Sequence, residues 1–586
     1  MSTPLPPSPL AADAVAGVTD KTLRTVLVDH WEWMMRWQPT YATTLGDHRY
    51  DDKLAPRDAA AIARMTVERD GLLARLGDVD AAQLGETDRV TYQLLRGRLE
   101  ADHALDVCRT WEWSIDAGGG SVLGELSYLV ESHTVKEPAD AEHLVARMGQ
   151  GAAAVDATIA NLKLGLAAGR VAGAGKVTRA IEQLDAELAK DVDSWAMANP
   201  AWATAPATGD TWPEGARDRL RAKLHDVVGS QLVPALVRLR DFLRDRILPK
   251  ARTELEGLSG LPDGDACYRA SILWQVGLPK APDELHALGL AEIAKSDAEI
   301  ARLGAVLFGT ADLAATIAHL RAGDPKLYFE SREQILAAAQ GMLDRAKAAV
   351  PKYFSVLPKI DCVMREIPDY EAPYSTIAYY RQPHYDGSKP GEYFVNTSKP
   401  ETRPRFELEA LTWHESIPGH HLQIALAMEL GALPAFRKLD GSTACVEGWA
   451  LYTERLAMEM GLYTGDLDRL GQASYDAWRG SRLVVDTGLH AMGWTRAQAE
   501  QFMREHTALT EGNIANEVDR YIGWPGQALA YKVGQLEILE LRARAEQELG
   551  DRFDLPGFHA VVLGAGAVTL PILDERVTAW IASRKS

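Results

Sequence analysis

The sequence predicts a mainly α-helical fold with a small β-sheet next to the helix that carries its most distinctive motif. Alanine and leucine are abundant and recur at helical spacing, whereas the Val/Ile/Thr alternation typical of strands is scarce. The 586 residues are 46% hydrophobic and 25% charged, as expected for a soluble globular protein with a large core. No apolar run approaches the ~18 residues of a membrane-spanning helix, so we expect no membrane partner.

Charge and cysteine content narrow the function class and the compartment. The net charge is −19 and no Lys/Arg-rich block occurs, so we expect no nucleic-acid partner. The four cysteines are widely spaced and show no pairing pattern, which is typical of the reducing cytoplasm. The N-terminus lacks a basic start, an apolar core and a lipidation cysteine. We therefore predict a flexible tail over residues 1–15 and a cytoplasmic protein.

Helices are predicted over most of residues 16–350. The first spans residues 20–37 and ends at Gln38-Pro39, because proline cannot continue the hydrogen-bond ladder. Apolar residues three and four positions apart mark a long amphipathic helix at residues 220–251. Further helices rich in alanine and leucine are predicted at residues 57–110 and 138–190.

A loop of conspicuous polarity at residues 46–52 interrupts these helices. It contains His48, Arg49 and Asp51. We predict that these side chains form a hydrogen-bonded structural turn, and a contribution to a cleft is the alternative.

Short β-prone segments appear after residue 351. Residues 362–367 and 393–396 are bounded by proline and glycine and predict a small sheet immediately before the motif. The edge of such a sheet can bind the backbone of an extended peptide. Tyr393 and Asn396 are therefore candidate substrate-binding residues, and an ordinary structural strand is the alternative.

Residues 413–421, Trp-His-Glu-Ser-Ile-Pro-Gly-His-His, place three histidines and a carboxylate in an otherwise apolar helix. Burying these groups is costly unless they bind something, and a divalent metal ion is the simplest explanation. In the zinc-hydrolase motif His-Glu-x-x-His, two histidines share a helix face and the glutamate acts as general base. Glu415 keeps its place after His414, so we predict it as the catalytic general base.

The spacing of the histidines departs from that motif. On a straight helix, His420 would lie on a different face from His414, and His421 would share its face about 10 Å further along the axis. Pro418 and Gly419 permit a break that loops out two residues. We predict His414 and His420 as metal ligands, with His421 as either a supporting neighbour or the true second ligand.

A third ligand is expected on a following helix. Glu447 is the only carboxylate in the apolar or small run at residues 441–452, so we predict it as this ligand. Glu454, about two turns further on, could orient a ligand imidazole. Cys445 could be a soft ligand, although a buried core cysteine is favoured. Imidazole and carboxylate ligands favour one Zn²⁺ ion.

The run His-Glu-x-x-Pro-Gly-His-His, followed by Val-Glu-Gly-Trp-Ala-Leu-Tyr, resembles the bacterial domain-of-unknown-function family 885. This family is distantly similar to the all-helical zinc peptidases of the thimet-oligopeptidase and carboxypeptidase Taq types. The resemblance implies a large helical fold with a deep cleft, in which residues 16–350 wall the cleft and form one compact unit with a catalytic region at residues 351–586. It also covers residues 44–52, Tyr379-Tyr380, Asp386-Gly387, Pro390-Gly391, residues 485–488 and residues 520–528.

The C-terminal part offers candidates for the remaining roles. Hydrolysis at zinc creates an oxyanion to which a tyrosine hydroxyl is a good donor, so Tyr521 and Tyr531 are the candidates. Arg520 or Lys532 could bind the terminal carboxylate of a peptide, arginine in bidentate fashion. His490 shares a helix face with an aspartate one turn earlier and could support the metal site or contact the intermediate. A buried core pair is the alternative for His490.

Together these residues predict a zinc-dependent metallopeptidase of the carboxypeptidase or oligopeptidase type that cleaves amide bonds of short peptides. Metal-activated water would attack the amide, and Glu415 would take the proton and pass it to the leaving amine. The alternatives are a hydrolase of a non-peptide or modified-peptide amide and a non-catalytic scaffold that binds metal or peptide. The expected partner is a short peptide or peptide-like molecule, and the sequence is compatible with a homodimer.

Overall fold

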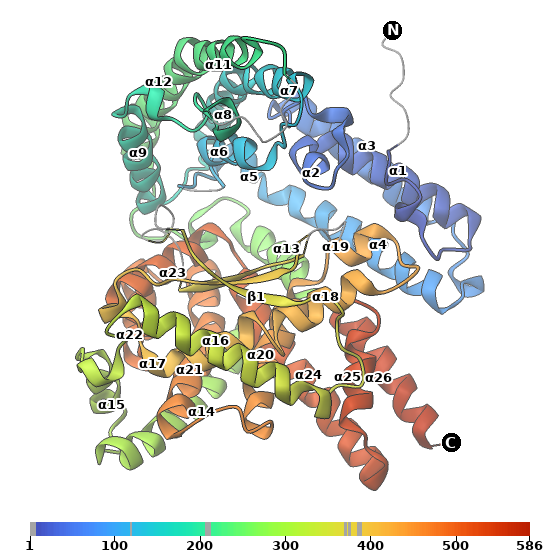
Figure 1. Ribbon diagram of the computed structural model, residues 1–586, viewed down its shortest axis with the longest axis vertical. Helices are drawn as coiled ribbons and strands as arrows, with labels where there is room; N and C mark the ends of the chain where they lie inside the picture. The colour runs from blue at the N-terminus through green and yellow to red at the C-terminus, as the bar shows by residue number, and fades with distance from the viewer. Residues whose placement is uncertain are drawn as a thin grey trace. The chain divides into compact units, whose positions relative to one another are not determined.

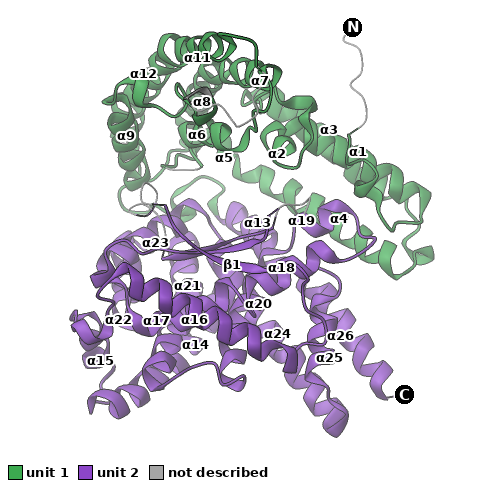
Figure 2. Cartoon of the chain, viewed as in Figure 1, with its two compact units in different colours: residues 1–264 green, residues 265–586 purple. Residues whose placement is uncertain are grey.

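The computed structural model describes residues 8–117, 120–204, 212–368, 372, 377–383 and 389–585. Helices make up 71% of the chain and the described strands form one three-stranded sheet, which confirms the mainly α-helical prediction. The chain divides into two compact units, unit 1 at Met1–Gly264 and unit 2 at Asp265–Ser586 (Figure 2). Residues 265–350, which the sequence groups with the N-terminal helices, therefore belong to unit 2. The role of the N-terminal helices as cleft walls stays a prediction.

The helices of unit 1 begin where the sequence offers a cap. Asp20, Asp58 and Ser121 each accept a hydrogen bond from a backbone N–H in the first turn that follows. The predicted first helix and its end at Pro39 are confirmed. The helices of this unit (Figure 1) are α1 (Lys21–Trp37), α2 (Pro39–Thr44), α3 (Ala59–Leu76), α4 (Glu86–Ala104), α5 (Thr110–Trp113), α6 (Val122–Ser132), α7 (Pro138–Met148), α8 (Gly151–Ala167), α9 (Ala174–Leu188), α10 (Ala201–Thr204), α11 (Ala216–Asp226) and α12 (Val233–Phe242).

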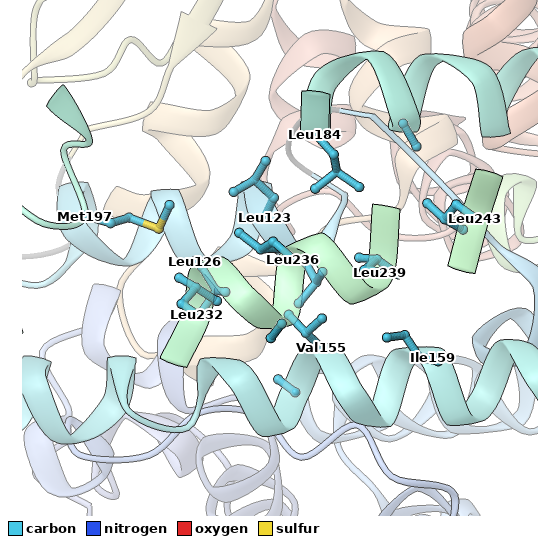
Figure 3. Packing of buried hydrophobic residues seen from close by; sticks show 14 of the residues in the cluster. Leu123, Leu126, Val155, Ile159, Leu184, Met197, Leu232, Leu236, Leu239 and Leu243 are labelled. Carbon is cyan, nitrogen blue, oxygen red and sulfur yellow. The ribbon is translucent and has the colours of Figure 1, made fainter. Parts of the chain in front are cut away.

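The amphipathic helix predicted at residues 220–251 is a run of helical segments. A π-helical stretch at Val227–Leu232 joins α11 to α12, and a second one at Leu243–Ile247 follows α12. The apolar side of this run faces the core of unit 1, where Leu236 of α12 lies with Val155 of α8 (Figure 3). Burial of each such side chain contributes about 1.5–3 kcal/mol.

The polar loop at residues 46–52 forms a hydrogen-bonded turn, as predicted. Asp47 is fully buried and accepts hydrogen bonds from Arg49 and from the hydroxyl of Ser8. Ser8 is itself buried, so the chain is held from this position on, and residues 1–7 of the predicted tail lie outside the described residues. Further side-chain contacts of the turn join Asp51 to Thr43 and to His48.

The sheet of unit 2 contains the two predicted strands and one that the sequence did not reveal. β1 (Cys362–Glu366) pairs in parallel with β3 (Gly391–Val395), and β3 pairs antiparallel with β2 (Ala378–Arg381). The order β1-β3-β2 makes β3 the central strand. The edge position predicted for residues 393–396 is therefore wrong, because the backbone groups of β3 already bond to strands on both sides.

Helices make up most of the rest of unit 2. Among the described residues, no single helix combines the length and apolar character of a membrane span; the bent pair α14 and α15 passes on length and composition only. The helices are α13 (Gly264–Val276), α14 (Pro282–Phe308), α15 (Leu313–Arg321), α16 (Arg332–Ala349), α17 (Arg405–Glu415), α18 (His420–Glu429), α19 (Ala435–Leu439), α20 (Thr443–Glu459), α21 (Asp466–Ala491), α22 (Arg496–His506), α23 (Glu511–Gly523), α24 (Gln527–Leu549), α25 (Leu555–Leu563) and α26 (Leu570–Lys585).

The cysteines differ from the expectation. Cys108 and Cys267 are disulfide-bonded, whereas Cys362 and Cys445 are free and buried. A disulfide bond is typical of an oxidising compartment. The cytoplasmic location stays a prediction. Burial raises the pKa of the Cys445 thiol to about 12, as expected for an inert core cysteine.

Candidate metal centre

The helix that carries the motif is broken between its histidines, as predicted. α17 ends at Glu415 and α18 begins at His420, and the Ile417–Pro418 peptide bond between them is cis. Gly419 is required in this break because a Cβ there would lie 2.0 Å from the carbonyl oxygen of His414. The break brings the rings of His414 and His420 to 4.8 Å between centroids, nearly perpendicular to each other.

Glu447 of α20 completes a group of three ligand atoms. Its Oε2 atom lies 3.7 Å from Nε2 of His414 and 3.5 Å from Nε2 of His420. These distances are too long for hydrogen bonds, which span about 2.7–3.2 Å. They are close to the separation of about 3.3–3.6 Å between neighbouring ligands of a tetrahedral zinc ion with bonds of about 2.0–2.2 Å. The same Oε2 atom is buried without a hydrogen-bond partner.

The position of Glu447 depends on a close approach of two helices. A Cβ on Gly448 of α20 would lie 2.4 Å from the backbone of Gly534 in α24, and a Cβ on Gly534 would lie 1.8 Å from the carbonyl oxygen of Ala444. Glycine at both positions lets the two backbones touch. This contact sets the distance between Glu447 on α20 and Tyr531 on α24.

Glu454 orients the first imidazole, as predicted. Its Oε1 atom lies 2.8 Å from Nδ1 of His414, and both side chains are buried. An Nδ1–H that donates to this carboxylate leaves Nε2 directed at Glu447 and His420. Burial opposes protonation of His414, but the carboxylates of Glu447 and Glu454 outweigh it and raise its pKa to about 9. A metal ion bound at this site would therefore compete with a proton.

Electrostatics around the other two ligands also suit a cation. Burial raises the pKa of Glu447, but the imidazoles of His414 and His420 reverse this and hold the pKa well below its usual value. The side chain of Glu447 is 17% exposed and that of His420 is 11% exposed, whereas that of His414 is only 2% exposed. The centre is thus open on the side of Glu447 and His420.

Glu415 lies directly beside this group, at the last position of α17. Its side chain is partly exposed, and its carboxylate has no hydrogen-bond partner among the residues that the structure describes. Below it, Tyr393 is fully buried and shares a hydrogen bond of 3.0 Å with the hydroxyl of Thr412. Tyr393 therefore supports the end of α17 and is not exposed to a substrate.

His421 is separate from the ligand group. Its Nδ1 atom lies 3.0 Å from the Tyr380 hydroxyl, and its Nε2 atom lies 3.2 Å from the carbonyl oxygen of Ile360. Burial lowers its pKa to about 4. Gly391 leaves room for these rings, since a Cβ there would lie 2.4 Å from Nδ1 of His421. Of the two histidines that the sequence left open as second ligand, the structure brings His420 to the group.

Tyr531 is the predicted tyrosine that reaches the centre. Its ring lies nearly parallel to that of His414, at 6.3 Å between centroids. Arg520 donates a hydrogen bond of 3.1 Å to its hydroxyl, and Gln527 donates a longer one of 3.4 Å. Both contacts use the oxygen as an acceptor, so the phenolic hydrogen is free to be donated elsewhere.

Tyr521 and His490 are not brought to the ligand group. The Tyr521 hydroxyl accepts from Trp478 and Arg482 and donates to Glu517 at 2.7 Å, and the side chain is 1% exposed. His490 donates from Nε2 to the backbone oxygen of Tyr521, which holds α23 against α21. Both residues therefore have structural contacts in the core.

Lys532 and Asn396 also have contacts that leave them unsuited to bind a substrate. Lys532 is 0% exposed and pairs with Asp476 at 2.6 Å and with Glu292 at 3.3 Å. The amide of Asn396 donates to the backbone oxygen of Ala372, and the side chain is 1% exposed. The sequence did not reveal this burial because the groups that pair with these side chains lie far away along the chain.

Two arginines of α21 were missed. The guanidinium of Arg482 lies 4.3 Å from the centre of the Tyr531 ring, and that of Arg479 lies 5.4 Å from it. A signal was present, because charged residues at positions 476, 479, 482 and 486 recur at helical spacing in an otherwise apolar or small-residue helix. Such a buried polar stripe indicates a functional or structural charge network.

Comparisons with known proteins identify the fold and the family of this chain. The chain has a TM-score of 0.88 and 26% identity to the "putative lipoprotein from Colwellia psychrerythraea", covering 96% of this chain and 99% of that one. A "putative lipoprotein of unknown function from Shewanella oneidensis" has a TM-score of 0.75 and 19% identity, covering 95% and 99%, and shows the fold alone. No curated protein matches the chain.

The sequence profile of one family matches most of the chain. The match covers residues 39–577 and includes the histidine motif, Glu447 and the glycine pair of α20 and α24. Asp386-Gly387, which belong to the resemblance noted from the sequence, lie outside the described residues. The chain belongs to the family described as "Bacterial protein of unknown function (DUF885)".

Proposed function

We propose that this protein is a zinc-dependent hydrolase that cleaves amide bonds of short peptides. The observation that carries the proposal is the group of His414, His420 and Glu447, whose ligand atoms lie within 4.8 Å of one another. Two imidazoles and one carboxylate are a ligand set of catalytic zinc sites that keep a fourth position open. The unpartnered Oε2 atom of Glu447 fits a cation at the same point.

The residues around this group can perform the steps of hydrolysis. A zinc ion held by His414, His420 and Glu447 would supply a Lewis acid and would lower the pKa of a bound water to about 7. Glu415 accepts the proton of the attacking water and passes it to the leaving amine, since its carboxylate is adjacent to His414 and has no other partner among the described residues. Tyr531 donates its free phenolic hydrogen to the oxyanion.

The test combines elemental analysis with mass spectrometry of a digested peptide library. We expect about one zinc ion per chain in the wild type and in Glu415→Gln, which retains all three ligands. We expect the Glu415→Gln variant to lose peptide cleavage, because an amide cannot act as the general base. Glu401→Gln, a change of the same kind at an exposed position, serves as the control.

Two outcomes would contradict the proposal. A protein without stoichiometric metal would exclude a zinc centre, and a Glu415→Gln variant as active as the wild type would exclude the general base. Stoichiometric zinc without cleavage of any peptide would instead support a non-peptide amide substrate or a binding scaffold.

A further inference from the structure

Arg479 carries a buried guanidinium that forms no hydrogen-bonded ion pair with the described residues. The residue is 4% exposed, and its Nε and Nη1 atoms are buried with no hydrogen-bond partner among the described residues. Its Cζ atom lies 3.8 Å from the ring centre of Trp478, which holds the guanidinium plane in place. An unpaired charge in a protein interior is costly, so such groups are normally matched by an anion.

The surroundings of Arg479 carry an excess of positive charge. Arg482 and Arg520 contact the same tyrosine, Tyr531, and one N–H group of Arg482 is also buried without a partner. Glu517 pairs with Arg482 at 2.9 Å and lies 3.7 Å from Arg520, so one carboxylate faces two guanidinium groups. This excess occurs in a chain whose net charge is −19.

Glu407 interacts electrostatically with Arg479, but it is a weak counterion. Glu407 is 4% exposed, and burial raises its pKa to about 7 although the Arg479 charge opposes this. A carboxyl group with this pKa is only partly ionised at neutral pH. Glu407 is therefore only a partial counterion to Arg479.

The ring of Tyr531 lies near both this positive region and His414 of the candidate metal centre. His414 stacks near the ring, and the guanidinium of Arg479 lies near the same ring. An anion bound to Arg479 and an amide held at the metal ligands would thus be one side chain apart. In a peptide, the terminal carboxylate follows the last amide bond by a single residue, about 3.5 Å of extended chain.

We infer that Arg479 binds the C-terminal carboxylate of the substrate, so that the protein removes residues from the C-terminal end of peptides. The inference rests on the hydrolase function proposed above. The guanidinium fork matches the two oxygens of a carboxylate, and Arg482 and Arg520 add favourable charge. In the reaction, the last C–N bond breaks, the water oxygen bonds to the acyl carbon, and the protons of the water pass to the new carboxyl group and the leaving amine.

The test uses three peptides that differ only at the C-terminus: N-acetyl-Ala-Ala-Phe with a free carboxylate, the same peptide as an amide, and N-acetyl-Ala-Ala-Glu amide. With zinc-loaded protein, we expect release of phenylalanine from the free acid. We expect its kcat/KM to exceed that of either amide by about 100-fold, the range for a lost charged contact. The glutamate peptide distinguishes a main-chain carboxylate from a side-chain carboxylate.

Variants locate the effect at Arg479. In Arg479→Met, the ratio of kcat/KM between acid and amide should fall towards 1, chiefly through KM, while zinc content stays at one ion. Arg479→Lys keeps the charge but not the fork and should recover part of the ratio. Arg584→Met is the matched control, because Arg584 also lies over a tryptophan but is 47% exposed. It should leave the ratio unchanged.

The outcomes separate this inference from the proposed function. Equal cleavage of acid and amide by the wild type would overturn the inference and leave the hydrolase function standing. Preferred cleavage of the glutamate amide would also overturn it. No cleavage of any peptide by zinc-loaded protein would remove the proposed function and the inference with it. If Arg479→Met does not fold, the inference is still tested by the ratio of kcat/KM between acid and amide in the wild type and in Arg479→Lys.

Discussion

Two groups of imidazole and carboxylate side chains in this protein place their ligand atoms within 4.8 Å, one in each unit. In unit 1, Asp70, His103 and Asp106 have side chains that are 38–59% exposed, and Arg69 donates hydrogen bonds to both carboxylates. In unit 2, His414, His420 and Glu447 are at most 17% exposed. There, the described residues place no guanidinium or ammonium group between the three.

The difference shows that residue types alone do not define a candidate metal site. The exposed group is already neutralised by an arginine, and water competes for each of its oxygens. The buried group has its charges at the wrong distance for hydrogen bonds, and an oxygen of Glu447 has no partner. The attraction of this group for a cation is strong because its three side chains are mostly buried. The predictions below test this contrast, from the largest expected effect to the smallest.

Replacing a ligand of the buried group should have the largest effect. We expect Glu447→Gln to lose stoichiometric zinc on dialysis and to lose activity by more than about 100-fold, because two imidazoles alone hold the ion weakly. Asp106→Asn makes the same chemical change in the exposed group and should alter neither quantity. Retention of zinc by Glu447→Gln would contradict the proposed difference between the buried and the exposed group.

A third charged group, around Lys532, is buried but fully paired. Lys532→Met would remove the buried ammonium group that contacts both Asp476 and Glu292, so we expect the free energy of unfolding to fall by about 3–5 kcal/mol in urea titrations. Lys295→Met is a matched control, because Lys295 pairs with the same Glu292 but is 70% exposed. It should cost less than about 1 kcal/mol. Equal losses in both variants would contradict the importance of burial.

Removing the carboxylate behind His414 should weaken the centre without abolishing it. We expect Glu454→Gln to lower zinc affinity about 10–100-fold in competition with a chelator, because the amide still accepts a hydrogen bond but carries no charge. Glu459→Gln, on the same helix but with a side chain that is 49% exposed, should leave affinity unchanged. An unchanged affinity in Glu454→Gln would mean that its contact with Nδ1 is only structural.

The smallest effect is expected in the exposed group. His103→Ala should leave zinc content unchanged and change the free energy of unfolding by less than about 0.5 kcal/mol, as for other surface substitutions. Calorimetric titration of zinc into the wild type and into His103→Ala measures the number of zinc sites directly. A second zinc site in the wild type that disappears in His103→Ala would show that the arginine does not prevent binding.

Local signals in the sequence were sufficient for several parts of the structure. The helix at residues 20–37, the break at Pro418-Gly419 and the strands at residues 362–367 each depend on caps, proline or β-propensity within a few residues. The contact of Glu454 with His414 followed from helical spacing together with the chemistry of zinc ligands.

The parts that were not predicted depend on partners distant in sequence. β3 is central because β2, which the sequence did not reveal, pairs on its second side. Lys532 is buried because Asp476 and Glu292 of two other helices meet it, and no pattern around position 532 indicates those partners. Arg479 differs from these cases, because its spacing with neighbouring charges on α21 was visible and was passed over.

The contact between Gly448 and Gly534 has a consequence for the variety of substrates that such a scaffold can accept. Because the backbones of α20 and α24 touch there, Glu447 and Tyr531 cannot shift independently of each other. Even an alanine at either glycine would force the two helices apart. Evolutionary change in substrate preference is therefore expected in the side chains around this rigid pair, while the pair itself stays constant.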